Sequence, residues 1–120
     1  LGVPYLWGGR TPAGMDCSGF VQLLLGEQGC RLPRDAADQE RVSRRLGLLE
    51  RARPGDLAFF GPARVPATHV GVLLGGGYYA HARGRVLINS LQSTNPLYDN
   101  ALSKQFRGLR RPPRGARKRA

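Results

Sequence analysis

A polar, glycine-rich opening followed by an apolar run predicts the first helix of the chain. Residues 1–14 are rich in glycine and proline and predict a loop around a short extended piece. The next segment, "DCSGFVQLLLGEQG", concentrates its large apolar residues in "FVQLLL". Asp16 is a preferred N-cap residue and Gly29 a preferred residue just past a helix end. We therefore expect a helix over about Cys17–Glu27.

The pattern then changes from helix to strand. A second, short and polar helix is expected after Pro33, and "RPGDLAFF" predicts a turn and a strand. "THVGVLL" and "YYAHA" are rich in β-forming residues with "GGG" between them, and "RVLINS" follows as a third strand, so an antiparallel meander is expected. Residues 91–106 look irregular. One or two helices followed by strands indicate an α+β fold.

Charge modifies this picture mainly at the C-terminus. The chain of 120 residues carries a net charge of +11, and seven of its cations lie between Arg107 and Ala120 without any acid. The remaining 12 cations and 8 acids give only +4. We expect a domain over residues 1–111 and a basic, disordered tail over 112–120 that can contact anionic polymer. No nucleic-acid-binding motif is present, so no specific nucleic-acid partner is expected.

The beginning of the chain carries less information. No apolar run approaches the roughly 20 residues that span a bilayer. The sequence opens at Leu1, without an initiator Met or a signal-peptide pattern and almost directly on its first motif. We expect a fragment whose N-terminal part is missing, so the missing signal does not define the compartment.

The two cysteines differ in their setting. Cys17 and Cys30 do not form a disulfide framework or a CxxC motif, and with the two histidines they match no zinc spacing, so no metal or other cofactor is expected. A thiol at a helix start is favoured as the thiolate by the unpaired N–H groups and the helix dipole. Cys17 is therefore the candidate nucleophile, whereas Cys30 is typical of a buried structural cysteine. The Asp16 carboxylate opposes a thiolate and should point elsewhere, for example toward a cationic substrate group.

The chain has two histidines, and a cysteine nucleophile needs one as its base. With a three-residue loop at 75–77, Leu74 pairs with Tyr78, and His69 and His81 lie on one face as diagonal neighbours. A loop at 74–76 places them directly opposite, and a two-residue loop places them on opposite faces. Together with Cys17, a shared face favours a catalytic set over two ordinary strand histidines.

Five motifs occur in an order that resembles the NlpC/P60 cysteine peptidases, over nearly the whole chain to about Arg111. They are "PYLWGG" at 4–9, "DCSGFV" at 16–21, "RPGDLAFF" at 53–60, "HVGVLLGGG" at 69–77 and "YAHA" at 79–82. The resemblance implies a papain-like α+β core in which the helix carrying Cys17 packs on an antiparallel sheet. It implies Cys17 as nucleophile, His69 as general base and acid, and His81 as the orienting third residue.

The resemblance also implies a substrate. The family cleaves cell-wall peptides, commonly the γ-D-glutamyl bond to meso-diaminopimelate or lysine. "LPRDAADQ" and "GRVLINSL" are similar to members that carry bacterial SH3 domains upstream and require a free N-terminal L-Ala. The substrate-binding positions this implies are Tyr5, Trp7, Asp16, Ser18, Arg34 and Asp35. Ala36 stands where a Ser is expected in this subgroup, which removes one hydrogen bond.

Other functions remain open at this point. A papain-like amidase or acyltransferase would use the same triad on another acyl group, and a non-catalytic wall-binding module would keep the fold alone. A polyanion-binding protein would depend on the tail. Acting on peptidoglycan stem peptides implies the cell envelope, periplasmic or secreted, with cytoplasmic muropeptide recycling as the alternative.

Overall fold

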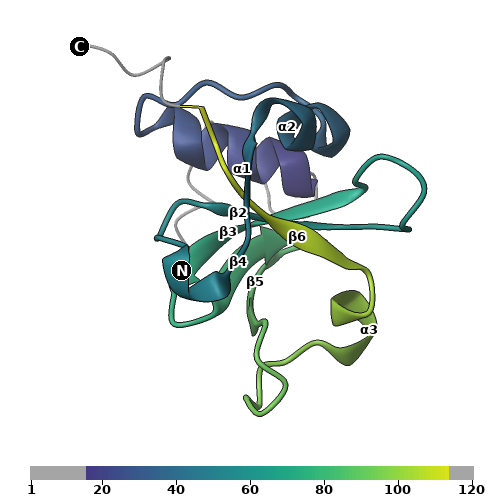
Figure 1. Ribbon diagram of the computed structural model, residues 1–120. Coiled ribbons are helices and arrows are strands. Elements are labelled where there is room, and N and C mark those ends of the chain that lie inside the picture. The colour runs from purple at the N-terminus through teal and green to yellow at the C-terminus, as the bar shows by residue number, and fades with distance from the viewer. Residues whose placement is uncertain (1–15, 114–120) are drawn as a thin grey trace.

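The computed structural model describes residues 16–113, in which two helices cover one face of a six-stranded antiparallel sheet (Figure 1). The strand order is β1-β6-β2-β3-β4-β5. The helices are α1 (Cys17–Gly26), α2 (Ala36–Val42) and α3 (Asn100–Ser103), with the 3-10 turn η3 (Leu49–Arg51). The strands are β1 (Arg44–Leu46), β2 (Leu57–Phe60), β3 (His69–Gly75), β4 (Tyr78–Ala82), β5 (Val86–Ser90) and β6 (Phe106–Arg111). The α+β prediction is confirmed.

Helix α1 begins and ends where the sequence predicted, to within a residue. The Asp16 side chain accepts a hydrogen bond from the Gly19 amide at 2.7 Å, as an N-cap does. Glu27 is the C-cap, and the turn beyond it ends at Gly29, whose φ of +82° favours glycine. This fixes Cys17 at the first position of the helix.

Two apolar layers hold the sheet. Beneath α1, the core contains Phe20, Val21, Leu25, Leu57, Phe59, Val70, Val72 and Ala80. On the opposite face a smaller cluster contains Ala58, Phe60, Leu73, Tyr79, Leu102 and Leu109. Because both faces are covered at the centre, all four residues of β2 are buried.

The hairpin that carries the histidines differs from the expected loop but keeps the expected register. Val72 pairs with Ala80 and Leu73 with Tyr79, as the three-residue loop predicted, but Gly75 rather than Leu74 pairs with Tyr78. The turn therefore has two residues, both at positive φ, and a bulge at Leu74 takes up the extra residue. A two-residue loop without the bulge would have placed His69 and His81 on opposite faces of the sheet. The bulge returns them to the same face.

The sequence analysis missed β1 and β6. Residues 107–111 were expected inside the domain, but their charge was counted with the basic C-terminus and no strand was assigned to them, whereas β6 lies between β1 and β2 in the sheet. Arg107 is paired with Glu40 at 2.9 Å, and Arg111 with the buried carboxylate of Asp56 at 3.0 Å. These ion pairs let arginines occupy an inner strand. Residues 114–120 lie outside the described part of the chain, so the disordered tail remains a prediction.

Candidate active site

Cys17 lies against the start of β3. Its thiol donates to the carbonyl oxygen of Thr68, with 3.8 Å between Sγ and O, and the backbone amide of Val70 also interacts with the sulfur. Thr68 and Val70 flank His69 on either side. The N-terminus of α1 therefore delivers the candidate nucleophile to the segment that carries the candidate base.

The environment of the thiol corrects one expectation. Burial raises the pKa of Cys17 above its ordinary value, and the Asp16 carboxylate adds to this effect, against backbone amides that lower it. The prediction that the helix start lowers the thiol pKa is therefore wrong for this protein without substrate. Desolvation outweighs the helix terminus, because Cys17 is half-buried against β3.

The two histidines lie on one face of the sheet, as predicted, and are hydrogen-bonded to each other. His69 Nε2 and His81 Nδ1 are 2.8 Å apart, and the two rings meet edge to face. His81 is completely buried, next to the rings of Tyr79 and, beyond it, Phe60. Gly71 makes room for this arrangement, because a Cβ there would lie 2.9 Å from the Tyr79 ring.

Burial keeps both imidazoles neutral. Burial, together with the neighbouring His81, lowers the pKa of His69 from 6.5 to about 4. Burial also lowers the pKa of His81, although its hydrogen bond to Asn89 acts in the opposite direction. At neutral pH the imidazole of His69, which directly follows the Thr68 carbonyl that the Cys17 thiol contacts, is therefore unprotonated, as a general base must be.

Asn89 is a member of this chain of hydrogen bonds that the sequence analysis did not include. Its Oδ1 lies 2.7 Å from Nε2 of His81, and its Nδ2 donates to the Leu97 carbonyl at 2.8 Å. The alternation of side chains along the strands could have indicated this position. Tyr79 pairs with Asn89, and side chains alternate along a strand, so Asn89 shares the face of His81.

The segment before His69 is anchored from the other side by a buried carboxylate. Glu40 accepts from the Ala67 amide at 3.3 Å and from Arg107 at 2.9 and 3.1 Å. Burial tends to raise the pKa of Glu40, but these donors hold it below its ordinary value. The hydrogen bond to Glu40 thus holds the backbone at Ala67, two residues before His69 and the start of β3.

The predicted recognition residues that the structure describes form a separate, charged cluster. Arg34 binds the Asp16 carboxylate through two nitrogens, at 3.1 and 3.0 Å, and also donates to the Ser18 hydroxyl at 3.1 Å. The Asp16 carboxylate thus pairs with Arg34 within the protein, and it still raises the pKa of the Cys17 thiol. Asp35 is exposed, precedes α2 and makes no side-chain cap bond. Tyr5 and Trp7 lie outside the described residues.

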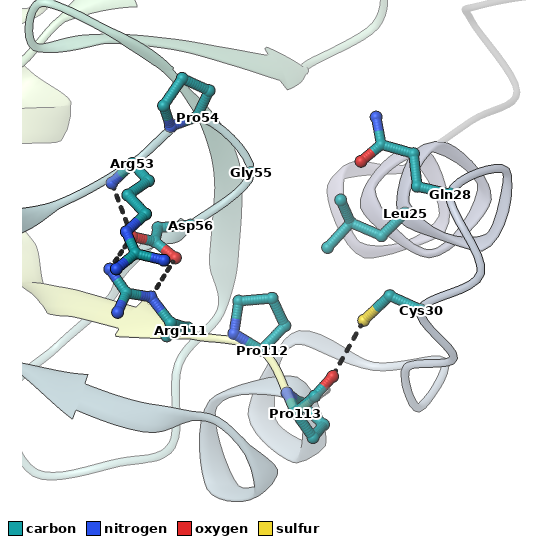
Figure 2. A pocket seen from close by; sticks show the side chains of 10 residues that line it. All are labelled: Leu25, Gln28, Cys30, Arg53, Pro54, Gly55, Asp56, Arg111, Pro112 and Pro113. Carbon is teal, nitrogen blue, oxygen red and sulfur yellow. Dashed lines mark hydrogen bonds and ion pairs between the residues drawn. The ribbon is translucent and has the colours of Figure 1, made fainter. Parts of the chain in front are cut away.

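Cys30 lies in a different part of the molecule, as its sequence context indicated. It is 6% exposed and donates to the Pro113 carbonyl at 3.4 Å. Figure 2 shows it lining a pocket between the end of α1 and the Asp56–Arg111 ion pair. Among the described residues no group of three or more His, Cys, Asp or Glu could hold a metal ion.

Comparison with known proteins identifies the family of this chain. The NlpC/P60 family profile matches residues 2–111. This chain belongs to the NlpC/P60 family. The chain is also 37% identical over 105 residues to the gamma-D-glutamyl-L-lysine dipeptidyl-peptidase of Bacillus subtilis (strain 168), covering 85% of this chain and 35% of that protein. The family predicted from the five motifs is therefore confirmed.

Solved NlpC/P60 structures include both lipoprotein-like and non-catalytic members. A lipoprotein-like NlpC/P60 protein of Staphylococcus aureus subsp. aureus Mu50 superposes with a TM-score of 0.71 at 32% identity, over 92% of this chain and 37% of that one. RipD of Mycobacterium tuberculosis, described as a non-catalytic NlpC/P60 domain protein adapted to peptidoglycan binding, superposes with a TM-score of 0.64 at 25% identity, over 87% of this chain and 70% of its own. The chain spans about a third of the curated relative's length. In residues 16–113 no helix is long and apolar enough to cross a membrane.

Proposed function

We propose that this domain is a cysteine peptidase that hydrolyses peptidoglycan stem peptides at the bond between γ-D-glutamate and the diamino acid, either meso-diaminopimelate or L-lysine. The observation that carries the proposal is the position of the Cys17 thiol between the backbone groups that flank His69, with His69 hydrogen-bonded to His81. The name of the Bacillus subtilis relative supports the choice of bond.

The residues divide the chemistry among them. His69 takes the thiol proton as Cys17 attacks the carbonyl carbon of the γ-glutamyl amide, which gives a tetrahedral intermediate. The Cys17 and Ser18 amides at the start of α1 interact with the sulfur and can donate to the developing oxyanion. His69 then protonates the leaving amine, a thioester forms on Cys17, and water assisted by His69 hydrolyses it.

Recognition of the substrate's amino end falls to the charged cluster beside Cys17. An ammonium group from a free N-terminal L-Ala would meet Asp35, whose carboxylate has no side-chain cap bond, and Asp16, which Arg34 already neutralises in part. Asp35 is thus the stronger candidate of the two. The proposed location is the cell envelope, periplasmic or secreted, with cytoplasmic muropeptide recycling as the alternative. Upstream SH3-like domains in a longer chain remain part of the proposal.

The test is product analysis on defined peptides. L-Ala-γ-D-Glu-L-Lys and its meso-diaminopimelate counterpart are incubated with the protein, and products are identified by liquid chromatography and mass spectrometry. We expect the wild type and Cys30→Ala to release L-Ala-D-Glu and the free diamino acid, and Cys17→Ala to release nothing. N-acetylated peptides show whether the free amine is required.

Two other outcomes would contradict the proposal. The non-catalytic description of RipD makes a peptidoglycan-binding module the second candidate. Binding of the peptides without any cleavage by the wild type would favour that function. Cleavage at another bond, or transfer of the acyl group to an added amine, would indicate an amidase or acyltransferase with the same residues.

A further inference from the structure

The chain of hydrogen bonds that ends at the Leu97 carbonyl determines where each proton of the site lies. A carbonyl oxygen can only accept, so the Asn89 group 2.8 Å from it is the amide NH2. The Asn89 Oδ1 is then the atom that faces His81 Nε2 at 2.7 Å. The Leu97 carbonyl therefore determines which end of the Asn89 amide is oxygen and which is nitrogen, two atoms that otherwise look alike.

The protons of both histidines follow from that orientation. Because Oδ1 only accepts, Nε2 of His81 must carry a hydrogen, and Nδ1 of the neutral ring is then an acceptor. The partner of this Nδ1 is Nε2 of His69, at 2.8 Å, which must therefore be the donor. In the neutral His69 ring the lone pair remains on Nδ1. The Cys17 thiol lies 3.8 Å from the carbonyl oxygen of Thr68, the residue just before His69.

We infer that Asn89 is a positioning residue that sets the tautomers of His81 and His69, so that Nδ1 of His69 is the base that accepts the Cys17 proton. This inference rests on the proposed function for its activity readout. The arrangement also serves the protonated state, because His69 Nε2–H keeps its donor role when Nδ1 gains a proton. No ring needs to rotate during the reaction.

The acceptor at the end of the chain is itself fixed. The Leu97 carbonyl also accepts from the Ser90 amide at 3.0 Å, so both of its lone pairs are used. The Leu97 amide donates to the side chain of Asn95 at 2.8 Å, and Asn95 Nδ2 donates to the Tyr78 hydroxyl at 2.7 Å. The loop after β5 is thus tied to β4 and β5 independently of Asn89.

Other charges near the two rings stay constant in the test. Arg83 lowers the pKa of both histidines and Asp99 raises it, and these two residues form an ion pair at 3.5 Å. The uncharged ring of Tyr79 lies against His81 on the same strand. A substitution of Asn89 therefore changes one hydrogen-bond partner of the two histidines and leaves the charges of Arg83 and Asp99 in place.

The first test needs no variant and no substrate. In the wild-type protein labelled with ¹⁵N-histidine, the ring nitrogen spectrum at neutral pH distinguishes the two tautomers. We expect both His69 and His81 to carry hydrogen on Nε2. A wild-type His69 with its hydrogen on Nδ1 would overturn the inference, whichever peptide bond the protein cleaves, and would leave the proposed substrate unaffected.

The second test separates positioning from general stability. Asn89→Ala removes the acceptor, and we expect kcat on the stem peptide to fall about 10-fold or more with little change in KM, since a wrong tautomer costs up to about 10⁴-fold in serine proteases. Asn89→Asp supplies a carboxylate that stabilises an imidazolium and should move the acidic limb of the kcat profile to higher pH. Asn95→Ala, which loosens the same loop without touching the histidines, should do neither.

The opposite results would overturn the inference. Equal losses of kcat in Asn89→Ala and Asn95→Ala, with unchanged tautomers in both, would show that Asn89 only supports the loop. An Asn89→Asp profile identical to that of the wild type would show that Asn89 does not influence the histidines. If Asn89→Ala fails to fold, the wild-type spectrum and the Asn89→Asp profile still decide the question.

Discussion

The two sides of Cys17 differ in burial and in charge. On the β3 side, His69 and His81 are neutral and packed among aromatic rings. His69 is hydrogen-bonded to His81 at 2.8 Å, and His81 to Asn89 at 2.7 Å. On the other side, Asp16 and Arg34 form an ion pair whose side chains are 59% and 55% exposed. A buried network holds one geometry, whereas an exposed pair can exchange partners with water or a ligand at little cost. Under the proposed function, proton transfer is assigned to the first side and substrate recognition to the second.

The largest expected effect is on the histidine side. His69→Ala removes the group that takes the thiol proton, so acylation of Cys17 should fall by roughly 10²-fold or more, with little change in KM. Single-turnover acylation by L-Ala-γ-D-Glu-L-Lys measures this. Near wild-type acylation in His69→Ala together with loss in His81→Ala would make His81 the base and reverse the order of the triad.

A graded effect is expected at His81, because its role is to accept a hydrogen bond. His81→Gln or His81→Asn keeps an acceptor for His69 and should retain measurable activity, whereas His81→Ala should lose more, by roughly 10-fold or above. The kcat values of the three variants provide the comparison. If the three variants lose the same activity, acceptance of a hydrogen bond is not what His81 contributes.

On the charged side the expected effect is on KM and depends on the substrate. Asp35→Asn should raise KM about 10-fold for a peptide with a free amino terminus, as loss of one charge-assisted hydrogen bond predicts, with kcat unchanged. The N-acetylated peptide should not distinguish the variant from the wild type. Asp38→Asn is the matched control, since Asp38 lies one turn along and pairs with Arg41. A similar rise in KM in Asp38→Asn would indicate a general charge effect instead.

No effect on chemistry is expected from the C-terminal residues. Removal of residues 114–120 takes away four cations but spares Pro113, whose carbonyl accepts from Cys30. We expect unchanged kcat/KM on soluble stem peptides, together with weaker and less salt-dependent binding to an anionic polymer. Reduced turnover or a lowered Tm would instead assign these residues to the folded domain.

Much of the histidine side could be predicted from the sequence, because it depends on alternation along strands. The shared face of His69 and His81 followed from the hairpin register of a three-residue loop, even though the bulge at Leu74, which gives a two-residue turn the same register, was not foreseen. The alternation that placed the histidines also places Asn89 on their face. Its role went unnoticed because the acceptor that orients it, the Leu97 carbonyl, lies in a loop with no periodic pattern.

Other features depend on tertiary contacts that no local pattern contains. Strand β6 was missed because "FRGLRR" is too basic for an inner strand unless Glu40 and Asp56 come from distant segments to neutralise it. The pairing of Asp16 with Arg34 likewise joins residues 18 positions apart. The raised pKa of Cys17 follows from packing against β3, whereas the sequence showed only the helix start, which acts in the opposite direction.

The proposed chemistry depends on the claim that the Cys17 thiol and the His69 imidazole are both neutral in the absence of substrate, and that the proton moves only during attack. The most direct test is the rate of Cys17 alkylation by iodoacetamide from pH 4 to 10, followed by intact mass in a Cys30→Ala background. Because burial raises the thiol pKa and lowers that of His69 to about 4, the rate should climb steadily through neutral pH and level off only in the alkaline range. A plateau that begins in the acid range and extends through neutral pH would reveal a preformed thiolate–imidazolium pair and contradict the claim.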